Sequence, residues 1–185
     1  MKKEREFRDT FTMEDVEFKL KNFHGGPDDF NPDGGKRYAL IYLDEAMAEK
    51  LSSEGYGVKM ENPDNHENPR PYIRINVRYR TEEELETMRA NGWRTKNPEI
   101  YTVSEGSNRR LLCSAKTVGD IDEDRVVKAD ITLSPSENRQ RPGSWSLWIR
   151  KAYIFTEKAK KDELDRKYAY LMEDDDDDDE GVPFN

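Results

Sequence analysis

The chain has 185 residues, of which 34% are hydrophobic and 38% are charged, and its formal net charge is −9. This length suits one domain with its own core. The single cysteine, Cys113, excludes an internal disulfide, and no apolar stretch reaches the roughly 18 to 20 residues of a membrane span. Because MKKEREFRDT opens the chain with charges instead of a signal peptide's apolar run, we expect a cytoplasmic protein.

The first 13 residues are charged and non-periodic, which predicts a flexible arm before a domain over 14–156. In DVEFKLKNF, residues 15–23, apolar and polar side chains alternate as in a half-buried strand, with Lys19, Lys21 and Phe23 on one face. The glycines, prolines and aspartates of 24–35 predict a shaped loop.

A buried strand is expected in KRYALIYLD, residues 36–44, because apolar residues occupy both of its faces. A short helix then begins at Asp44 or Glu45 and ends near Gly55. The strand YGVKM follows, with Lys59 near its end.

The next strand, RPYIRINVRYR over 70–80, has one apolar and one cationic face. Its apolar face carries Pro71, Ile73, Ile75, Val77 and Tyr79, and its other face carries Arg70, Tyr72, Arg74, Asn76, Arg78 and Arg80. Such a face is either a solvated sheet surface or a surface that binds an anionic partner.

A second helix is predicted in TEEELETMRANG, with Thr81 as N-cap, Glu84 as its capping-box partner and Gly92 at the end. Strands are expected at about 99–104, 110–118, 125–133 and 144–155, followed by a helix over 157–172. Short connections favour a mainly β protein, a small barrel with two inserted helices, over an α/β sheet.

Enzyme signals are weak. The histidines stand in turn-rich loops, and one cysteine cannot make a Cys/His zinc site. GDIDED, residues 119–124, starts like a calcium loop but lacks its glycine and final glutamate, and is expected to be a solvated loop. We expect no metal, no cofactor and no enzyme activity, while a nucleic-acid enzyme with carboxylate-bound metal stays an alternative.

Binding signals are stronger, because single-stranded nucleic acid needs cations for phosphates and aromatic faces for bases. In SWSLWIRKAYIF either face of the strand could point outward, and we favour Trp148 and Arg150 outward, with core packing the alternative for the tryptophans. The predicted DNA contacts are Lys19, Lys21, Phe23, Arg37, Lys59, Tyr72, Arg74, Asn76, Arg78, Arg80, Trp148 and Arg150.

The tail, Glu173 to Glu180, reads EDDDDDDE and carries eight of the 40 acids, which leaves 32 acids against 31 bases in residues 1–172. Mutual repulsion predicts a disordered tail over 173–185. It is either a solubilising tail or, with its apolar ending, a docking segment that also competes with DNA for a cationic groove. The docking residues would be Asp174, Asp175, Asp176, Asp177, Asp178, Asp179, Val182, Pro183 and Phe184.

DDDDDDEGVPF resembles the acidic tip of bacterial and bacteriophage single-stranded DNA-binding proteins. NFHGG, FNPDGGKRYALIYLD, EGYGVKM and PYIRINVRY resemble phage-encoded members of that family. The resemblance implies an OB-fold over 14–156 and single-strand DNA binding without sequence preference in replication, recombination or repair. It also implies that the strand over 72–80 lines the groove and that the tail recruits replication or recombination proteins.

This chain departs from the family's pattern in one respect, because Asn185 follows the phenylalanine on which the familiar tip ends. An acidic-tailed adaptor or chaperone, whose cationic face meets a protein, stays the alternative function. Self-association of the chain also stays open, and a phage-encoded member would act in the host cytoplasm.

Overall fold

The computed structural model describes residues 7–106 and 109–157. The acidic tail over 173–185 lies outside these residues, as does the expected helix over 157–172 apart from Glu157. The predictions for both segments therefore stay predictions.

The described residues form nine strands, two α-helices and one short 3-10 helix. The strands are β1 (Phe11–Val16), β2 (Phe18–Asn22), β3 (Arg37–Tyr42), β4 (Lys59–Met60), β5 (Pro71–Val77), β6 (Glu99–Ser104), β7 (Arg110–Leu112), β8 (Val126–Glu137) and β9 (Trp145–Thr156). The helices are α1 (Glu45–Ser53), α2 (Glu82–Ala90) and the 3-10 helix η1 (Val118–Asp122).

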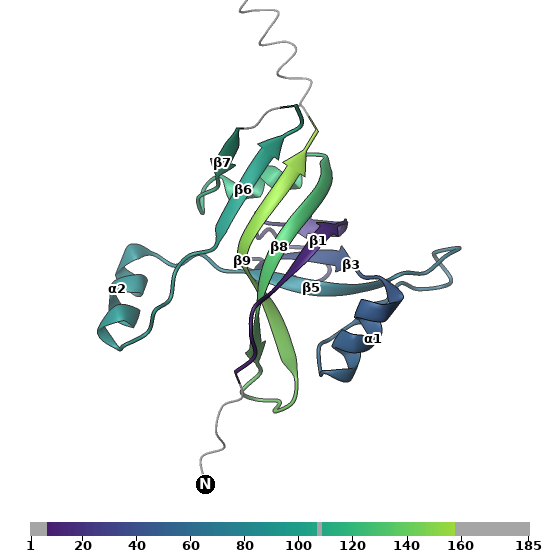
Figure 1. Ribbon diagram of the computed structural model, residues 1–185, viewed down its shortest axis with the longest axis horizontal. Helices are drawn as coiled ribbons and strands as arrows, with labels where there is room; N and C mark the ends of the chain where they lie inside the picture. Colours follow the sequence, from purple (N-terminus) through teal and green to yellow (C-terminus); the bar gives the residue numbers. More distant parts are fainter. Residues whose placement is uncertain (1–6, 107–108, 158–185) are drawn as a thin grey trace, which may run out of the picture.

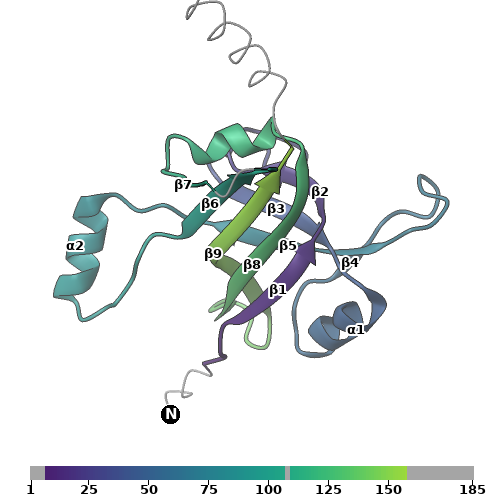
Figure 2. The ribbon, with the colours of Figure 1, turned by 45° about the horizontal axis from the view of Figure 1, so that its top comes forward.

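The strands form one sheet in the order β1-β8-β9-β5-β3-β2, and Figures 1 and 2 show it coiled around a core. Only Glu17 separates β1 from β2, so one bent segment pairs with β8 through its first half and with β3 through its second. β5 and β9 pair in parallel. The expected mainly β fold with two helices is confirmed, and the strand order supports a partly open barrel, whereas the name OB-fold stays an expectation.

The core explains why alternation predicted β5 correctly. Ile73, Ile75 and Val77 are buried in the main hydrophobic cluster, while Arg74 and Asn76 between them are partly exposed. The expected burial of β3 is confirmed as well, because residues 38–41 are buried on both faces.

Several expected segments differ in the structure. Of the expected strand YGVKM only the last two residues form β4, and β8 continues to Glu137, past the expected end at about 133. β1 begins at Phe11, inside the expected arm, because Phe11 and Met13 pack against the core. The strand expected over 110–118 ends at Leu112, and the expected loop 119–124 lies largely within η1. Val118 and Ile121 explain this difference, since η1 buries both against the end of the barrel (Figure 2).

Both helices begin at the predicted caps. The Asp44 carboxylate accepts a hydrogen bond from the Met47 amide, and the Thr81 hydroxyl accepts one from the Glu84 amide. Figures 1 and 2 show α1 and α2 on opposite sides of the strands, with α2 held away from the body by its connecting segments. Of the residues of α2, all of which the structure describes, Leu85 is the buried one. No helix in the described ranges is both long and apolar enough to span a membrane.

Candidate nucleic-acid interface

The outward side of β2, β3 and β5 carries tyrosines, and we call Tyr38, Leu40, Tyr42, Tyr72 and Arg74 the β3–β5 face. A cation lies against each tyrosine ring. The Arg74 guanidinium is 4.1 Å from the centroid of Tyr38, and the Arg70 guanidinium is 3.8 Å from that of Tyr42. The Lys19 ammonium lies 5.3 Å from the centroid of Tyr72.

Two of the three rings of this face are covered in the free protein, whereas Tyr42 is partly exposed. Tyr38 has no exposed surface, and Tyr72, a predicted base-stacking residue, is 9% exposed. The Tyr38 hydroxyl donates to the Asp28 carboxylate, and burial together with this bond raises the pKa of Tyr38 to about 12. A base could stack on Tyr72 only if its neighbours moved.

Acids balance the cations of the β3–β5 face. The buried Glu61 carboxylate accepts hydrogen bonds from Lys19 and from the Tyr42 hydroxyl. The hydrogen bond from Lys19 is the main cause that lowers the pKa of Glu61. Arg70 donates two hydrogen bonds, of 3.1 and 3.0 Å, to the carboxylate of Glu17.

The predicted common face of Lys19, Lys21 and Phe23 is wrong. A β-bulge between Phe18 and Leu20 places an extra residue, Lys19, in the strand and shifts the alternation after it. Lys21 instead donates to the carbonyl of Ile121 at the end of η1. Phe23 is fully buried, so it has no exposed face on which a base could stack.

Arg37 and Lys59, two further predicted phosphate contacts, differ in their surroundings. Arg37 donates to the carbonyls of Phe23 and Ala115, so its guanidinium already holds two loops together. Lys59 is exposed on β4, where it pairs in register with Tyr72. Of the two, Lys59 is the one whose charge faces solvent.

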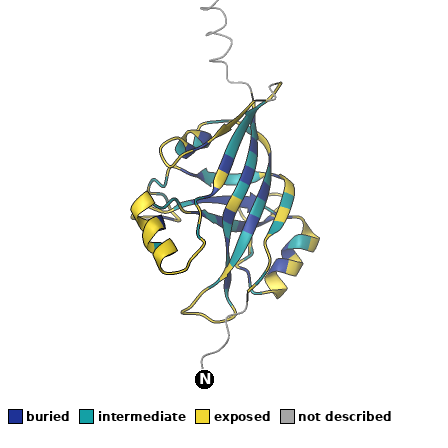
Figure 3. Ribbon diagram, turned by 60° about the vertical axis from the view of Figure 1, so that its left-hand side comes forward, coloured by how far each residue is buried: buried dark blue, intermediate teal, exposed yellow. Residues whose placement is uncertain are grey.

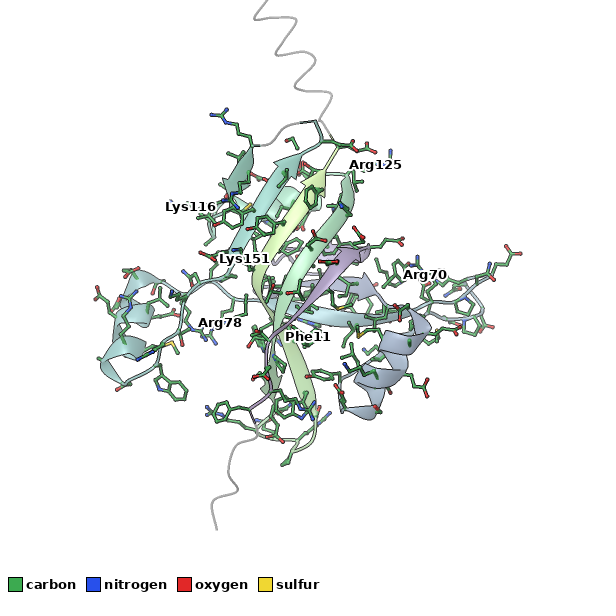
Figure 4. All side chains as sticks on the ribbon, in the orientation of Figure 1. Phe11, Arg70, Arg78, Lys116, Arg125 and Lys151 are labelled. Carbon is green, nitrogen blue, oxygen red and sulfur yellow. The ribbon has the colours of Figure 1, made fainter. Side chains whose placement is uncertain are left out.

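A cleft of about 970 Å³ opens beside the far end of β5, between the α2–β6 connection and the β8–β9 hairpin. We call it the α2 cleft. Figure 4 places Arg78 between α2 and the strands. The cations that line this cleft include Arg78, Arg80, Lys96, Arg139 and Arg150, and its exposed or partly exposed tryptophans are Trp93 and Trp148.

Strand register connects the α2 cleft to the β3–β5 face. Asn76 on β5 pairs with Trp148 on the parallel strand β9, and the Asn76 amide donates to the carbonyl of Leu147. Arg74 in turn donates to the side-chain oxygen of Asn76 at 2.9 Å. The predicted outward direction of Trp148 and Arg150 agrees with their exposure, since Trp148 is partly exposed and Arg150 exposed.

The cations of the α2 cleft act on one another. Burial lowers the pKa of Arg80, the charge of Arg78 lowers it further, and Arg150 contributes in the same direction while Glu84 opposes them. Among the described residues, the guanidinium groups of these three arginines form no ion pair with a carboxylate. A phosphate bound here would relieve their mutual repulsion.

Sequence reasoning missed Trp93, Lys96 and Arg139 as candidate contacts. Trp93 is 50% exposed and directly follows Gly92, the glycine past the end of α2. Neither strand nor helix periodicity applies to a loop residue, so only the exposure of so large an apolar ring marks it. Within the described part of the chain, no group of three or more His, Cys, Asp or Glu side chains could hold a metal ion.

The family model described as a putative phage single-stranded DNA-binding domain matches residues 1–182. The crystal structure of gp2.5, a single-stranded DNA-binding protein encoded by bacteriophage T7, aligns with 96% of this chain and 99% of its own. The identity is 12% and the TM-score 0.37, a likeness too loose to carry an argument. No curated protein matches the chain.

Proposed function

Since the chain belongs to the phage single-stranded DNA-binding domain family, we propose that it binds single-stranded DNA without sequence preference through the α2 cleft. The observation that carries this placement is the meeting of Arg78, Arg80 and Arg150, which form no ion pair with a carboxylate of the described residues, with Trp93 and Trp148 in one cleft. A single-stranded nucleic acid needs this combination of cations for its backbone and aromatic faces for its bases.

In this proposal the arginines of the cleft neutralise phosphates and release the counterions that had screened them. Trp148 and Trp93 stack on bases, which requires no sequence because every base has an aromatic face. Through Asn76 the DNA path reaches Arg74 at the edge of the β3–β5 face. Lys59 extends the cationic surface past Tyr72.

The biological role proposed is binding and protection of single strands during replication, recombination or repair. The acidic tail, Asp174 to Phe184, would recruit replication or recombination proteins and compete with DNA for the cleft. Charge complementarity supports the competition, because the tail's acids match the arginines of the cleft. No cofactor or enzyme activity is part of this proposal.

Fluorescence anisotropy of labelled single- and double-stranded oligonucleotides tests the function. The titration uses the full-length chain and a version ending at Met172, each at low and moderate salt. We expect salt-sensitive binding that favours single strands and becomes tighter when the tail is removed. Failure of both versions to bind would overturn the proposal and favour an adaptor whose cationic surface meets a protein.

A control variant separates site-specific binding from general charge attraction. Arg125 lies just before β8 (Figure 4), and its side chain is 82% exposed. Its Nε atom is 3.4 Å from Oε1 of Glu157. Arg125→Ala removes one positive charge outside the cleft, as Arg78→Ala does within it. If the affinity for single-stranded DNA falls by the same factor in both variants, the α2 cleft is not the binding surface.

A further inference from the structure

β9 carries the outward surface of the barrel beyond the α2 cleft. Figure 1 shows this strand between β8 and β6. Leu133 pairs with Ile149 and Thr132 with Lys151, so Arg150 is an extra residue that forms a bulge. The bulge shifts the alternation of buried and exposed side chains along β9. After it, Lys151 and Tyr153 are partly exposed, while residues 152 and 154 are buried. Figure 3 shows this alternation along the strands.

Tyr153 stacks on a second tyrosine beyond this bulge. Tyr101 on β6 pairs in register with Tyr153, and their rings lie 5.3 Å apart between centroids at an angle of 14°. Both rings are partly exposed. The two nearly parallel, partly exposed rings stack on each other across neighbouring strands, so a base would extend this stack on an outer face of the pair.

Cations border these rings. Arg110 on β7 donates to the Tyr153 hydroxyl at 3.1 Å, and its guanidinium lies 5.4 Å from the centroid of Tyr101. The Lys151 ammonium lies 5.4 Å from the centroid of Tyr153, in the direction of the α2 cleft along β9. We call these four residues, Tyr101, Arg110, Lys151 and Tyr153, the tyrosine platform.

We propose that the tyrosine platform is a second base-stacking site, which extends the DNA path of the α2 cleft along β9. This inference rests on the proposed function. Trp148 and Tyr153 are five residues apart on one strand, a span of about 16 Å at about 3.3 Å per residue. Arg150 and Lys151 lie between them, so phosphates could be neutralised along the whole span.

The charges near the platform are mixed, because on the β6 side Arg110 stands near one end while the exposed Glu99 pairs in register with Lys151 at the other. On the other side Asp130 pairs with Tyr153 in register, and its carboxylate accepts a hydrogen bond from the Asp15 amide. A DNA backbone would therefore pass over β6 and β7, where Arg110 stands, and avoid β8. Leu111 and Leu112, which are 64% and 61% exposed, mark the boundary of this path.

Two oligonucleotide lengths separate the platform from the cleft. Domains of this kind cover about 4 to 16 nucleotides, so labelled single strands of about 6 and about 16 nucleotides would occupy the cleft alone or the cleft with the platform. We expect Tyr153→Ala and Arg110→Ala each to lower the ratio of long- to short-oligonucleotide affinity, by about tenfold for the loss of the stacking ring.

Two further variants test the reason for this loss. Tyr153→Phe keeps the ring and loses the bond to Arg110, so it should recover most of the binding that Tyr153→Ala loses. Arg125→Ala, which removes an exposed charge at the start of β8, should leave the ratio unchanged. Arg110 is exposed on a three-residue strand, so Arg110→Ala gives a result even if Tyr153→Ala fails to fold.

Each outcome decides one claim. An unchanged ratio in Tyr153→Ala and Arg110→Ala overturns the platform, while the cleft stands. Equal losses at both lengths also overturn it, because the residues would then act through the cleft or the fold. If the unaltered protein binds neither oligonucleotide, the proposed function itself fails.

Discussion

The β3–β5 face and the α2 cleft contain the same kinds of side chain in opposite states. On the face, cations lie against the three tyrosine rings, and Glu61 and Glu17 pair with Lys19 and Arg70. In the cleft, burial and the charges of Arg78 and Arg150 lower the pKa of Arg80, and none of the three forms an ion pair with a carboxylate of the described residues. Arginine and aromatic residues on a strand therefore do not by themselves mark a binding surface.

The difference follows from what each region does for folding. Interactions on the β3–β5 face are complete within the protein, so they contribute to the stability of the fold. Cations that are crowded together repel one another and lower the stability of the fold. A protein tolerates this loss of stability at a binding site, where an anionic ligand removes the repulsion. The comparison predicts that substitutions on the face lower stability, whereas substitutions in the cleft lower affinity for DNA.

The largest expected effect is that of Tyr38→Ala. The side chain is fully buried under Arg74 and its hydroxyl donates to Asp28. Truncation of a buried aromatic side chain costs about 3 to 5 kcal/mol, so the free energy of unfolding should fall by that amount in urea denaturation. A variant that kept its stability but lost DNA affinity would break the comparison, since the face would then be a binding surface.

Trp148→Ala should act on binding instead. Its ring is partly exposed beside Asn76, and the loss of one stacked base is worth about 1 to 3 kcal/mol of DNA-binding free energy in an anisotropy titration. Trp145 on the same strand is the matched control, because it also lines the cleft but is only 5% exposed and belongs to the core. Trp145→Ala should chiefly lower the free energy of unfolding. Equal behaviour of the two variants would contradict the assignment.

Arg78→Ala and Arg70→Ala compare an arginine that has no carboxylate partner in the described part of the chain with one that is paired to Glu17. Loss of one phosphate contact flattens the dependence of log affinity on log salt by about 0.7 for a single strand. We expect this change for Arg78→Ala and little change for Arg70→Ala, whose guanidinium is bound to Glu17 in the free protein. A larger effect at Arg70 would move the proposed DNA path onto the β3–β5 face.

Much of this architecture was predictable because it depends on neighbours along the chain. The alternation of β5 and the caps at Asp44 and Thr81 need only a few consecutive residues. The bulges at Lys19 and Arg150 were not predictable, since each depends on the strand that pairs with it. Each bulge shifts the alternation of the residues that follow it.

The candidate site was predictable only in part, for a related reason. Alternation placed Arg78 on the cationic face, whereas for Trp148 and Arg150 it left both faces open, and the face that we favoured agrees with their exposure. Trp93 joins them through a loop, and Tyr101 meets Tyr153 through a pairing of strands distant in the chain. Phe23 shows the reverse error, in which an aromatic residue next to lysines belongs to the core.

The smallest expected effect, that of Glu61→Gln, changes a partner of the β3–β5 face without removing a large side chain. The carboxylate lies among Lys19, the Tyr42 hydroxyl and His66, whose Nε2 is 3.4 Å away. The hydrogen bond from Lys19 lowers the pKa of Glu61 in the folded state. The unfolded chain then binds the proton more readily, so this contribution is present above the ordinary pKa and is lost as pH falls through the lowered one.

Unfolding in urea should therefore depend less on pH in Glu61→Gln than in the unaltered protein as the pH falls below the ordinary pKa of a glutamate. The same substitution leaves Lys19 without its carboxylate, at the edge of the proposed DNA path. A slight gain in DNA affinity at neutral pH would then show that pairing with acids, and not position, keeps the β3–β5 face from binding. Lower affinity would show instead that Glu61 orders Lys19 for contact with DNA.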